Sequence, residues 1–99
     1  MLARLRNGLQ AVYGPRLRGL YLYGSYARSQ QDVESDVDLL IVLDRVDRYA
    51  EEIDRTGALI SAVSLDAGVS ISRVIVSDAQ WNFSENHFLA GVREDAVAV

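Results

Sequence analysis

Two short groups of residues in this 99-residue chain have the types and spacing that phosphate chemistry requires. Gly24 and Ser25 follow an apolar run, and after ten further residues Asp36 and Asp38 open a second apolar run. Residues i and i+2 of a strand point to the same face, so we expect the two carboxylates to project together. Two oxygen ligands beside a Gly-Ser turn suit Mg²⁺ bound to a phosphate chain. The pattern therefore indicates a site for nucleotidyl transfer.

Alternating helical and extended patterns must position these groups. Apolar residues at helical spacing predict helices over 2–12 and about 48–65, with a short helix capped by Ser25 over 25–30. Apolar extended runs predict strands near 19–23, 36–43 and 69–76. One final helix is expected to begin near Ser77 or Asp78. This order predicts an α/β fold in which a small mixed β-sheet is covered by helices, organised as a single domain over 1–99.

The C-terminal part of the chain carries two further expectations. Four apolar residues are spaced to face the core from the final helix: Trp81, Phe88, Leu89 and Val92. The apolar stretch 90–99 is expected to join either a sheet edge or an interface with a partner.

Composition limits the class of protein. Hydrophobic residues make up 49% and charged residues 24%, which is ordinary for a globular domain. No apolar run approaches the ~20 residues that cross a bilayer, and the N-terminus has no secretory pattern. Cysteine is absent, which excludes disulfides and thiolate metal sites. We therefore expect a cytoplasmic protein with no membrane partner.

Charge limits the partners. The net charge is −4, and most of the acidic residues fall between positions 32 and 54. Such a surface repels polyanions, so we expect no long nucleic acid as a partner. Lysine is absent, so any cationic contact to a phosphate must come from an arginine.

The same residues carry a resemblance to a known family. Gly-Ser, ten residues and Asp-x-Asp, at positions 24–38, resemble the signature of the polymerase-beta-like nucleotidyltransferase superfamily. The short chain, the Ala27-Arg28 pair and the run 35–40 resemble its minimal nucleotidyltransferase (MNT) branch, whose members are often antitoxin partners of HEPN toxins. The resemblance extends over essentially the whole chain and is strongest over 21–42.

This resemblance implies roles for five residues. Asp36 and Asp38 would be the catalytic carboxylates that bind Mg²⁺, which neutralises charge on the departing pyrophosphate. Gly24, Ser25 and Arg28 would bind the nucleotide, with ATP as substrate and its phosphates at a helix N-terminus. A plain surface position is an equal alternative for Arg28.

One departure from the family pattern bears on activity. Active members usually carry a third carboxylate on the neighbouring strand, where it completes the metal site and acts as a base. The predicted strand over 69–76 has no acidic residue and offers Ser70 and Ser72 on its polar face. Asp66 and Asp78 lie outside it. Nucleotide binding is therefore better supported than turnover.

Three functions remain open at this point. The first is an enzyme, the antitoxin of a HEPN/MNT toxin–antitoxin pair, which AMPylates a tyrosine hydroxyl of its partner RNase toxin. The second is an inactive or weakened antitoxin of the same fold that neutralises the toxin by stoichiometric binding in a hetero-complex. The third is transfer to a small molecule of the aminoglycoside type, although relatives with that activity usually carry an added helical domain.

Overall fold

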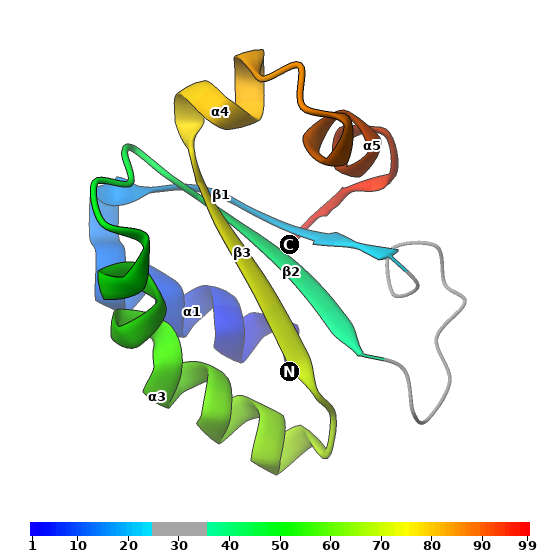
Figure 1. Ribbon diagram of the computed structural model, residues 1–99. Coiled ribbons are helices and arrows are strands. Elements are labelled where there is room, and N and C mark those ends of the chain that lie inside the picture. Colours follow the sequence, from blue (N-terminus) through cyan, green and yellow to red (C-terminus); the bar gives the residue numbers. More distant parts are fainter. Residues whose placement is uncertain (25–35) are drawn as a thin grey trace.

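The fold is built on a four-stranded mixed sheet, seen in a computed structural model that describes residues 1–24 and 36–99 (Figure 1). The strand order is β3-β2-β1-β4. The strands are β1 (Leu17–Tyr23), β2 (Val37–Leu43), β3 (Ile71–Ser77) and β4 (Val97–Ala98). Central strand β2 runs antiparallel to β1 and parallel to β3. The predicted α/β fold with a mixed sheet is confirmed.

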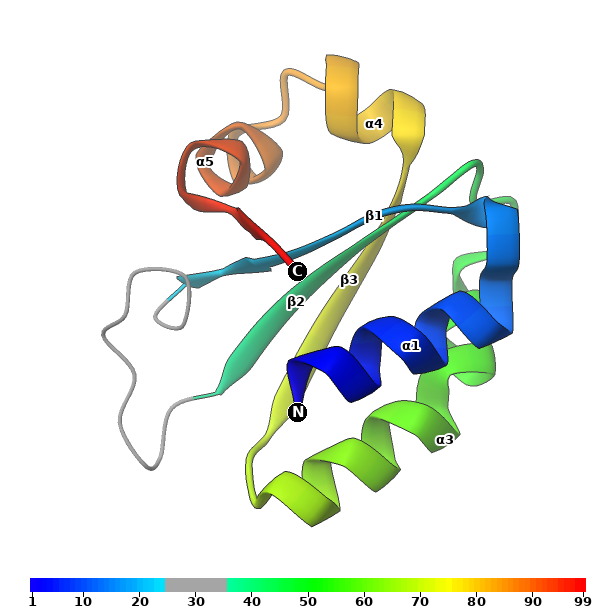
Figure 2. The same ribbon diagram turned by 180° about the vertical axis from the view of Figure 1, so that it is seen from behind.

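Helices cover both faces of this sheet. The helices α1 (Leu2–Tyr13) and α3 (Tyr49–Ala67) lie on one face, and α4 (Asp78–Phe83) and α5 (His87–Asp95) lie on the other (Figures 1 and 2). A 3₁₀ turn, η1 (Gly14–Arg16), connects α1 to β1 where Gly14 and Pro15 interrupt the helical pattern. The two central strands are therefore enclosed between two helical layers.

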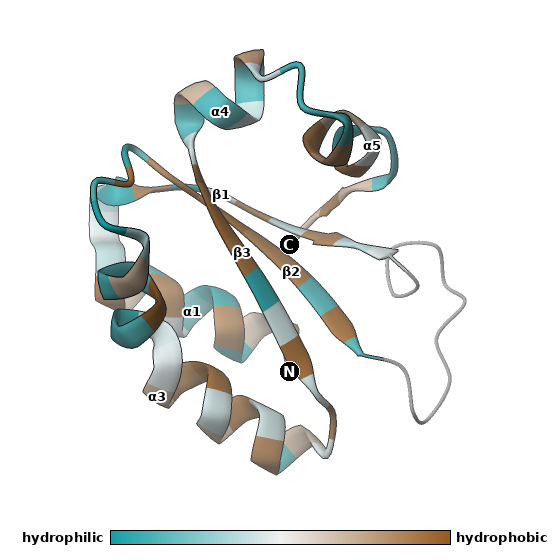
Figure 3. Cartoon of the chain, in the orientation of Figure 1, coloured by the Kyte–Doolittle hydropathy of each residue, from teal (hydrophilic) through white to brown (hydrophobic). Residues whose placement is uncertain are grey.

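The hydrophobic core lies on both sides of β2. From Leu39 to Leu43 each residue of β2 is at most 1% exposed. Alternate side chains of the strand belong to two clusters, one against α1 and α3 and the other against α4 and α5. Hydrophobic colouring accordingly covers most of β2 and the C-terminal part of β3 (Figure 3). A strand buried on both faces forms a continuous apolar run, which is why 39–43 contains no polar residue.

The predicted single C-terminal helix is wrong, because the structure has two. Helix α4 begins with a capping box between Ser77 and Gln80. Helix α5 begins at a second cap, where Oδ1 of Asn86 accepts hydrogen bonds from the backbone N–H groups of Phe88 and Leu89 at 2.8 and 3.3 Å. A residue with two local acceptor bonds starts a new helix rather than continuing the old one. The chain turns between α4 and α5, and this turn places α5 over β1.

The turn also changes the expected core. Leu89 and Val92 are buried as predicted, each 6% exposed, whereas Phe88 is 47% exposed. The new helix start rotates Phe88 away from the core and toward the end of β1. The predicted helix over 25–30 lies outside the described residues.

The C-terminal stretch joins a sheet edge, as one of the two alternatives predicted. In β4, Val97 and Ala98 pair with Leu22 and Tyr21, and the Val99 N–H donates to the Leu20 carbonyl at 2.9 Å. Across residues 1–24 and 36–99, no helix has the length and apolar character that a bilayer crossing requires.

Candidate nucleotidyl-transfer site

The proposed site forms where β1 ends and β2 begins. Tyr23, the last residue of β1, pairs with Asp38 of β2. Val37 is fully buried, whereas Asp36 is exposed and Asp38 is half-buried. The alternation of a strand thus directs Val37 into the core and the two aspartates to the opposite face, the face that α5 also covers.

Gly24 lies directly against Asp38. Its φ of +71° is one that side-chain-bearing residues rarely adopt. A Cβ built on Gly24 would lie 2.5 Å from Oδ2 of Asp38, well inside van der Waals contact. Glycine is therefore required here on two grounds, and the fold brings two of the predicted site residues together.

Electrostatics at this point favour a cation. The pKa of Asp38 is raised, first by burial and second by the negative charge of Asp36. Two neighbouring carboxylates with this mutual repulsion suit a divalent cation, which would favour their charged forms. Mg²⁺ is commonly held by one or two carboxylates, with substrate phosphates and water as its remaining ligands. Asp36 and Asp38 therefore fit Mg²⁺ together with a bound nucleotide.

On β3, the position where a third carboxylate would complete the metal site is occupied by a serine. In the parallel pairing of β2 with β3, Asp38 lies opposite Ser72, so both residues project from the same face of the sheet. Ser72 is exposed. The next residue, Arg73, points to the other face and donates hydrogen bonds to Oγ1 of Thr56 and the carbonyl of Ile53, both at 2.8 Å.

The acidic residues flanking β3 do not complete a cluster. In the described parts of the chain, no three His, Asp or Glu side chains are grouped closely enough to hold a metal ion. Asp66 forms an ion pair with Arg4 of α1, and Asp78 accepts a hydrogen bond from Asn82 at 2.9 Å. Among the residues that the structure describes, Asp36 and Asp38 are therefore the pair of carboxylates at the start of β2 that could bind a metal ion.

An aromatic pocket of about 370 Å³ adjoins Gly24. Its lining residues come from the end of β1 and from α5: Tyr23, Gly24, His87, Phe88, Gly91, Val92 and Asp95. The helical spacing of Phe88 predicts a core position and so does not reveal this pocket. One signal was present, since Gly91 is an isolated glycine inside a helix, where glycine costs about 1 kcal/mol relative to alanine.

Two predicted nucleotide-binding residues, Ser25 and Arg28, lie outside the described residues, so their positions remain predictions. Their neighbour Gly24 is described and directly follows the last residue of β1, Tyr23, at the site.

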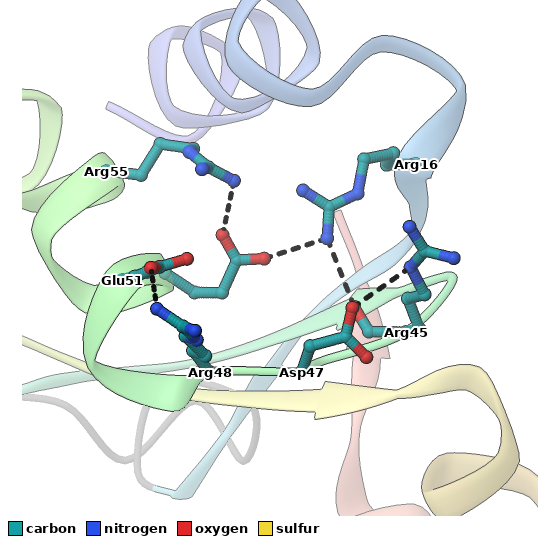
Figure 4. A pocket seen from close by; sticks show the side chains of 7 residues that line it. Arg16, Arg45, Asp47, Arg48, Glu51 and Arg55 are labelled. Atoms are coloured by element: carbon teal, nitrogen blue, oxygen red, sulfur yellow. Dashed lines mark hydrogen bonds and ion pairs between the residues drawn. The ribbon is translucent and has the colours of Figure 1, made fainter.

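A second, strongly charged pocket of about 240 Å³ lies at the far end of the sheet (Figure 4). At its base Glu52 is 3% exposed and accepts hydrogen bonds from Arg16 and Arg55 at 2.8 and 2.6 Å. Arg48 pairs with Glu51 at 3.2 Å on the rim. Arginines and acids pair with each other here, which indicates a structural network joining α3 to η1, the turn before β1.

The fold is that of known toxin–antitoxin proteins. A toxin–antitoxin crystal structure with AMP-PNP matches 99% of this chain and 72% of its own chain, with a TM-score of 0.64 and 17% identity. A mutant of the toxin–antitoxin MntA-HpeT matches 94% of this chain and 67% of its own, with a TM-score of 0.59 and 15% identity. At such identities the likeness shows the fold alone, a small α/β domain.

Sequence comparison defines the family. The model of the nucleotidyltransferase domain family matches residues 2–94, and the chain belongs to this family. It is 32% identical over 80 residues to "Putative protein adenylyltransferase MJ0604" of Methanocaldococcus jannaschii, covering 81% of this chain and 80% of that protein. The resemblance drawn from residues 24–38 is thereby confirmed.

Proposed function

We propose that this chain transfers AMP from Mg-ATP to a tyrosine hydroxyl of a partner RNase toxin of the HEPN class, and so acts as its antitoxin. The observation that carries the proposal is the pair Asp36 and Asp38 on one face of the sheet, with Gly24 packed against Asp38. Membership of the nucleotidyltransferase domain family supports the reaction class. The name of the related adenylyltransferase supports AMP as the transferred group. The proposal sets the protein in the cytoplasm, where ATP is available.

Each residue would contribute a defined part of the chemistry. Asp36 and Asp38 would hold Mg²⁺, which would supply neutralisation of the charge that develops on the leaving group. Gly24, with Ser25 and Arg28, would hold the phosphate chain in a fixed position. The tyrosine oxygen forms a bond to the α-phosphorus, the bond to the bridging oxygen of the β-phosphate breaks, and pyrophosphate leaves. The phenolic proton passes to solvent, since the position facing Asp38 on β3 is Ser72 rather than a base.

Intact mass measurement tests this proposal. The protein encoded beside this one is incubated with this chain, Mg²⁺ and ATP. We expect a mass increase of one or more AMP units, which disappears when Asp36→Asn and Asp38→Asn are combined. Replacing Asp47 and Asp54 by Asn is the matched control, because it removes the same charge from exposed positions away from the site. A control that loses activity equally would contradict the assigned role of Asp36 and Asp38.

A second function is favoured by Ser72, because the residue of β3 opposite Asp38 is a serine and not a third carboxylate. In that case the chain neutralises the toxin by stoichiometric binding. A stable complex without added mass, and with toxin inhibition retained by the Asp36→Asn/Asp38→Asn variant, would support this second function. Loss of inhibition in a variant that still forms the complex would exclude it.

A further inference from the structure

The aromatic pocket lies next to the proposed phosphate site along the chain as well as in space. Tyr23 forms part of its wall, and the following residue, Gly24, belongs both to the pocket and to the contact with Asp38. A small molecule held at Gly24 and Asp38 by its phosphates therefore has its remaining part at the mouth of this pocket. The volume of about 370 Å³ lies in the ~300–1,000 Å³ range typical of small-molecule sites.

Two aromatic rings define the wall of the pocket. The rings of Tyr23 and Phe88 meet edge to face, with centroids 5.8 Å apart and planes at 84°. Phe88 nevertheless remains 47% exposed, so a large apolar surface is held in place beside the site without being covered. Exposed aromatic faces of this kind stack on nucleobases with little dependence on base identity.

The helical side of the pocket is left open by a glycine. Gly91 lies in α5 between Phe88 and Asp95, and a Cβ built at this position meets no atom of residues 1–24 and 36–99 within 4 Å. The backbone would accept a side chain there, and the helix would be more stable for it. The missing side chain widens the pocket beside Phe88.

From these three features we propose that the pocket between β1 and α5 binds the nucleobase of the triphosphate, which packs against the rings of Tyr23 and Phe88. This inference rests on the proposed function, because it takes the phosphates to lie at Gly24 and Asp38. It assigns α5 to substrate binding in addition to its packing role.

The geometry of transfer favours the base over the acceptor tyrosine in this pocket. An attacking oxygen must approach the α-phosphorus in line with the leaving pyrophosphate, from the side opposite to it. Ser72 is exposed on β3, which lies on the other side of β2 from the strand that lines the pocket. We therefore assign the acceptor to the side of Asp38 that faces β3.

Filling the pocket tests the inference. Calorimetry is used to measure the binding of Mg-ATP and of Mg-tripolyphosphate, which lacks a base, to the full chain and to its Gly91→Leu variant. We expect Gly91→Leu to weaken Mg-ATP binding about tenfold or more, as the loss of base stacking predicts, and to leave tripolyphosphate binding unchanged. Phe88→Ala, at a half-exposed position, should weaken ATP binding in the same selective way.

Gly57→Leu is the matched control, since Gly57 also lies inside a helix and does not line the pocket, and a Cβ built there meets no atom of the described residues within 4 Å. Its affinity for both ligands should equal that of the unchanged chain. Equal ATP affinity in the Gly91→Leu variant would overturn the inference while leaving the proposed function standing. Unchanged ATP affinity with reduced AMP transfer would also overturn it and would assign the pocket to the acceptor. Absence of any Mg-ATP binding by the unchanged chain would overturn both.

Discussion

Gly24 and Asp38 are fitted to each other across the end of the β1–β2 pair. The Oδ2 atom of Asp38 lies 2.5 Å from the position that a Cβ of Gly24 would occupy, and Gly24 holds a φ of +71°. The carboxylate can lie against the backbone only because the side chain is absent. The glycine of the Gly-Ser pair is therefore needed for the packing of Asp38, which belongs to the Asp-x-Asp pair of the same motif.

Replacing this glycine should therefore be more damaging than replacing a glycine in an ordinary turn. We expect Gly24→Ala to lower the free energy of unfolding by about 1–2 kcal/mol through backbone strain, and to displace Asp38 so that Mg-ATP binding is lost. Gly68→Ala is the control, because Gly68 has a φ of +69° and a Cβ added there would meet no atom within 4 Å in the part of the chain that the structure describes. Calorimetry and urea unfolding check both variants. Equal ATP affinity in the two would contradict the fitted contact.

A carboxylate at position 72 should strengthen the proposed metal site. Ser72 faces the same side of the sheet as Asp38, directly across the β2–β3 pairing. We expect Ser72→Asp to raise Mg²⁺-dependent AMP transfer about tenfold or more, because a third oxygen ligand and a base become available. The uncharged variant Ser72→Asn serves as the comparison in the same single-turnover assay. A gain shared by both variants would show that the charge is not the cause.

The buried carboxylate of Glu52 should be important for stability rather than for activity. It is 3% exposed and accepts hydrogen bonds from Arg16 and Arg55, and more weakly from Tyr13 at 3.5 Å. We expect Glu52→Gln to cost about 2–4 kcal/mol of unfolding free energy, since two arginines lose a buried charged partner.

Glu51→Gln provides the comparison for that experiment. Glu51 pairs with Arg48 on the surface, where both side chains are more than half exposed. Its loss should cost less than about 1 kcal/mol in the same urea titration. A similar loss of unfolding free energy in the two variants would show that burial does not make the Glu52 ion pairs more stabilising than the exposed one.

The metal-free protein should show the effect of the raised pKa of Asp38. Burial and Asp36 disfavour the charged form, so the folded pKa lies above the unfolded value. The fold therefore loses stability as pH rises from the ordinary aspartate pKa, about 3.9, through the raised folded pKa, and the loss is complete above it. With a chelator at pH 7, Asp38→Asn should be more stable than the unchanged chain, because the amide carries no charge to be penalised by burial and by Asp36. The difference should vanish in acid, and thermal unfolding between pH 3 and 7 measures it.

Much of the fold follows from local patterns. The predicted helix over 2–12 is observed as α1, and the predicted helix over about 48–65 as α3. The strand expected over 36–43 is observed as β2, because a run of apolar β-branched and leucine residues fits a strand buried on both faces. The break between α4 and α5 was missed, since the side chains of Ser84 and Asn86 cap the turn and helical spacing continues across it.

The sequence by itself determined the chemistry available to this protein. Residue types and spacing predicted two carboxylates on one face of a strand, a glycine turn before them, and the lack of an acid on the third strand. All of these depend on the alternation of a strand or on the identity of a single residue, and neither needs knowledge of distant contacts.

Tertiary structure alone decided what lies beside those groups. The pairing of β1 with β2 brought Gly24 against Asp38, and the parallel pairing of β2 with β3 set Ser72 opposite the same carboxylate. The turn before α5 carried Phe88 to the ring of Tyr23, far from it in the chain. Register and helix placement arise from packing of the whole core, which local sequence patterns do not specify.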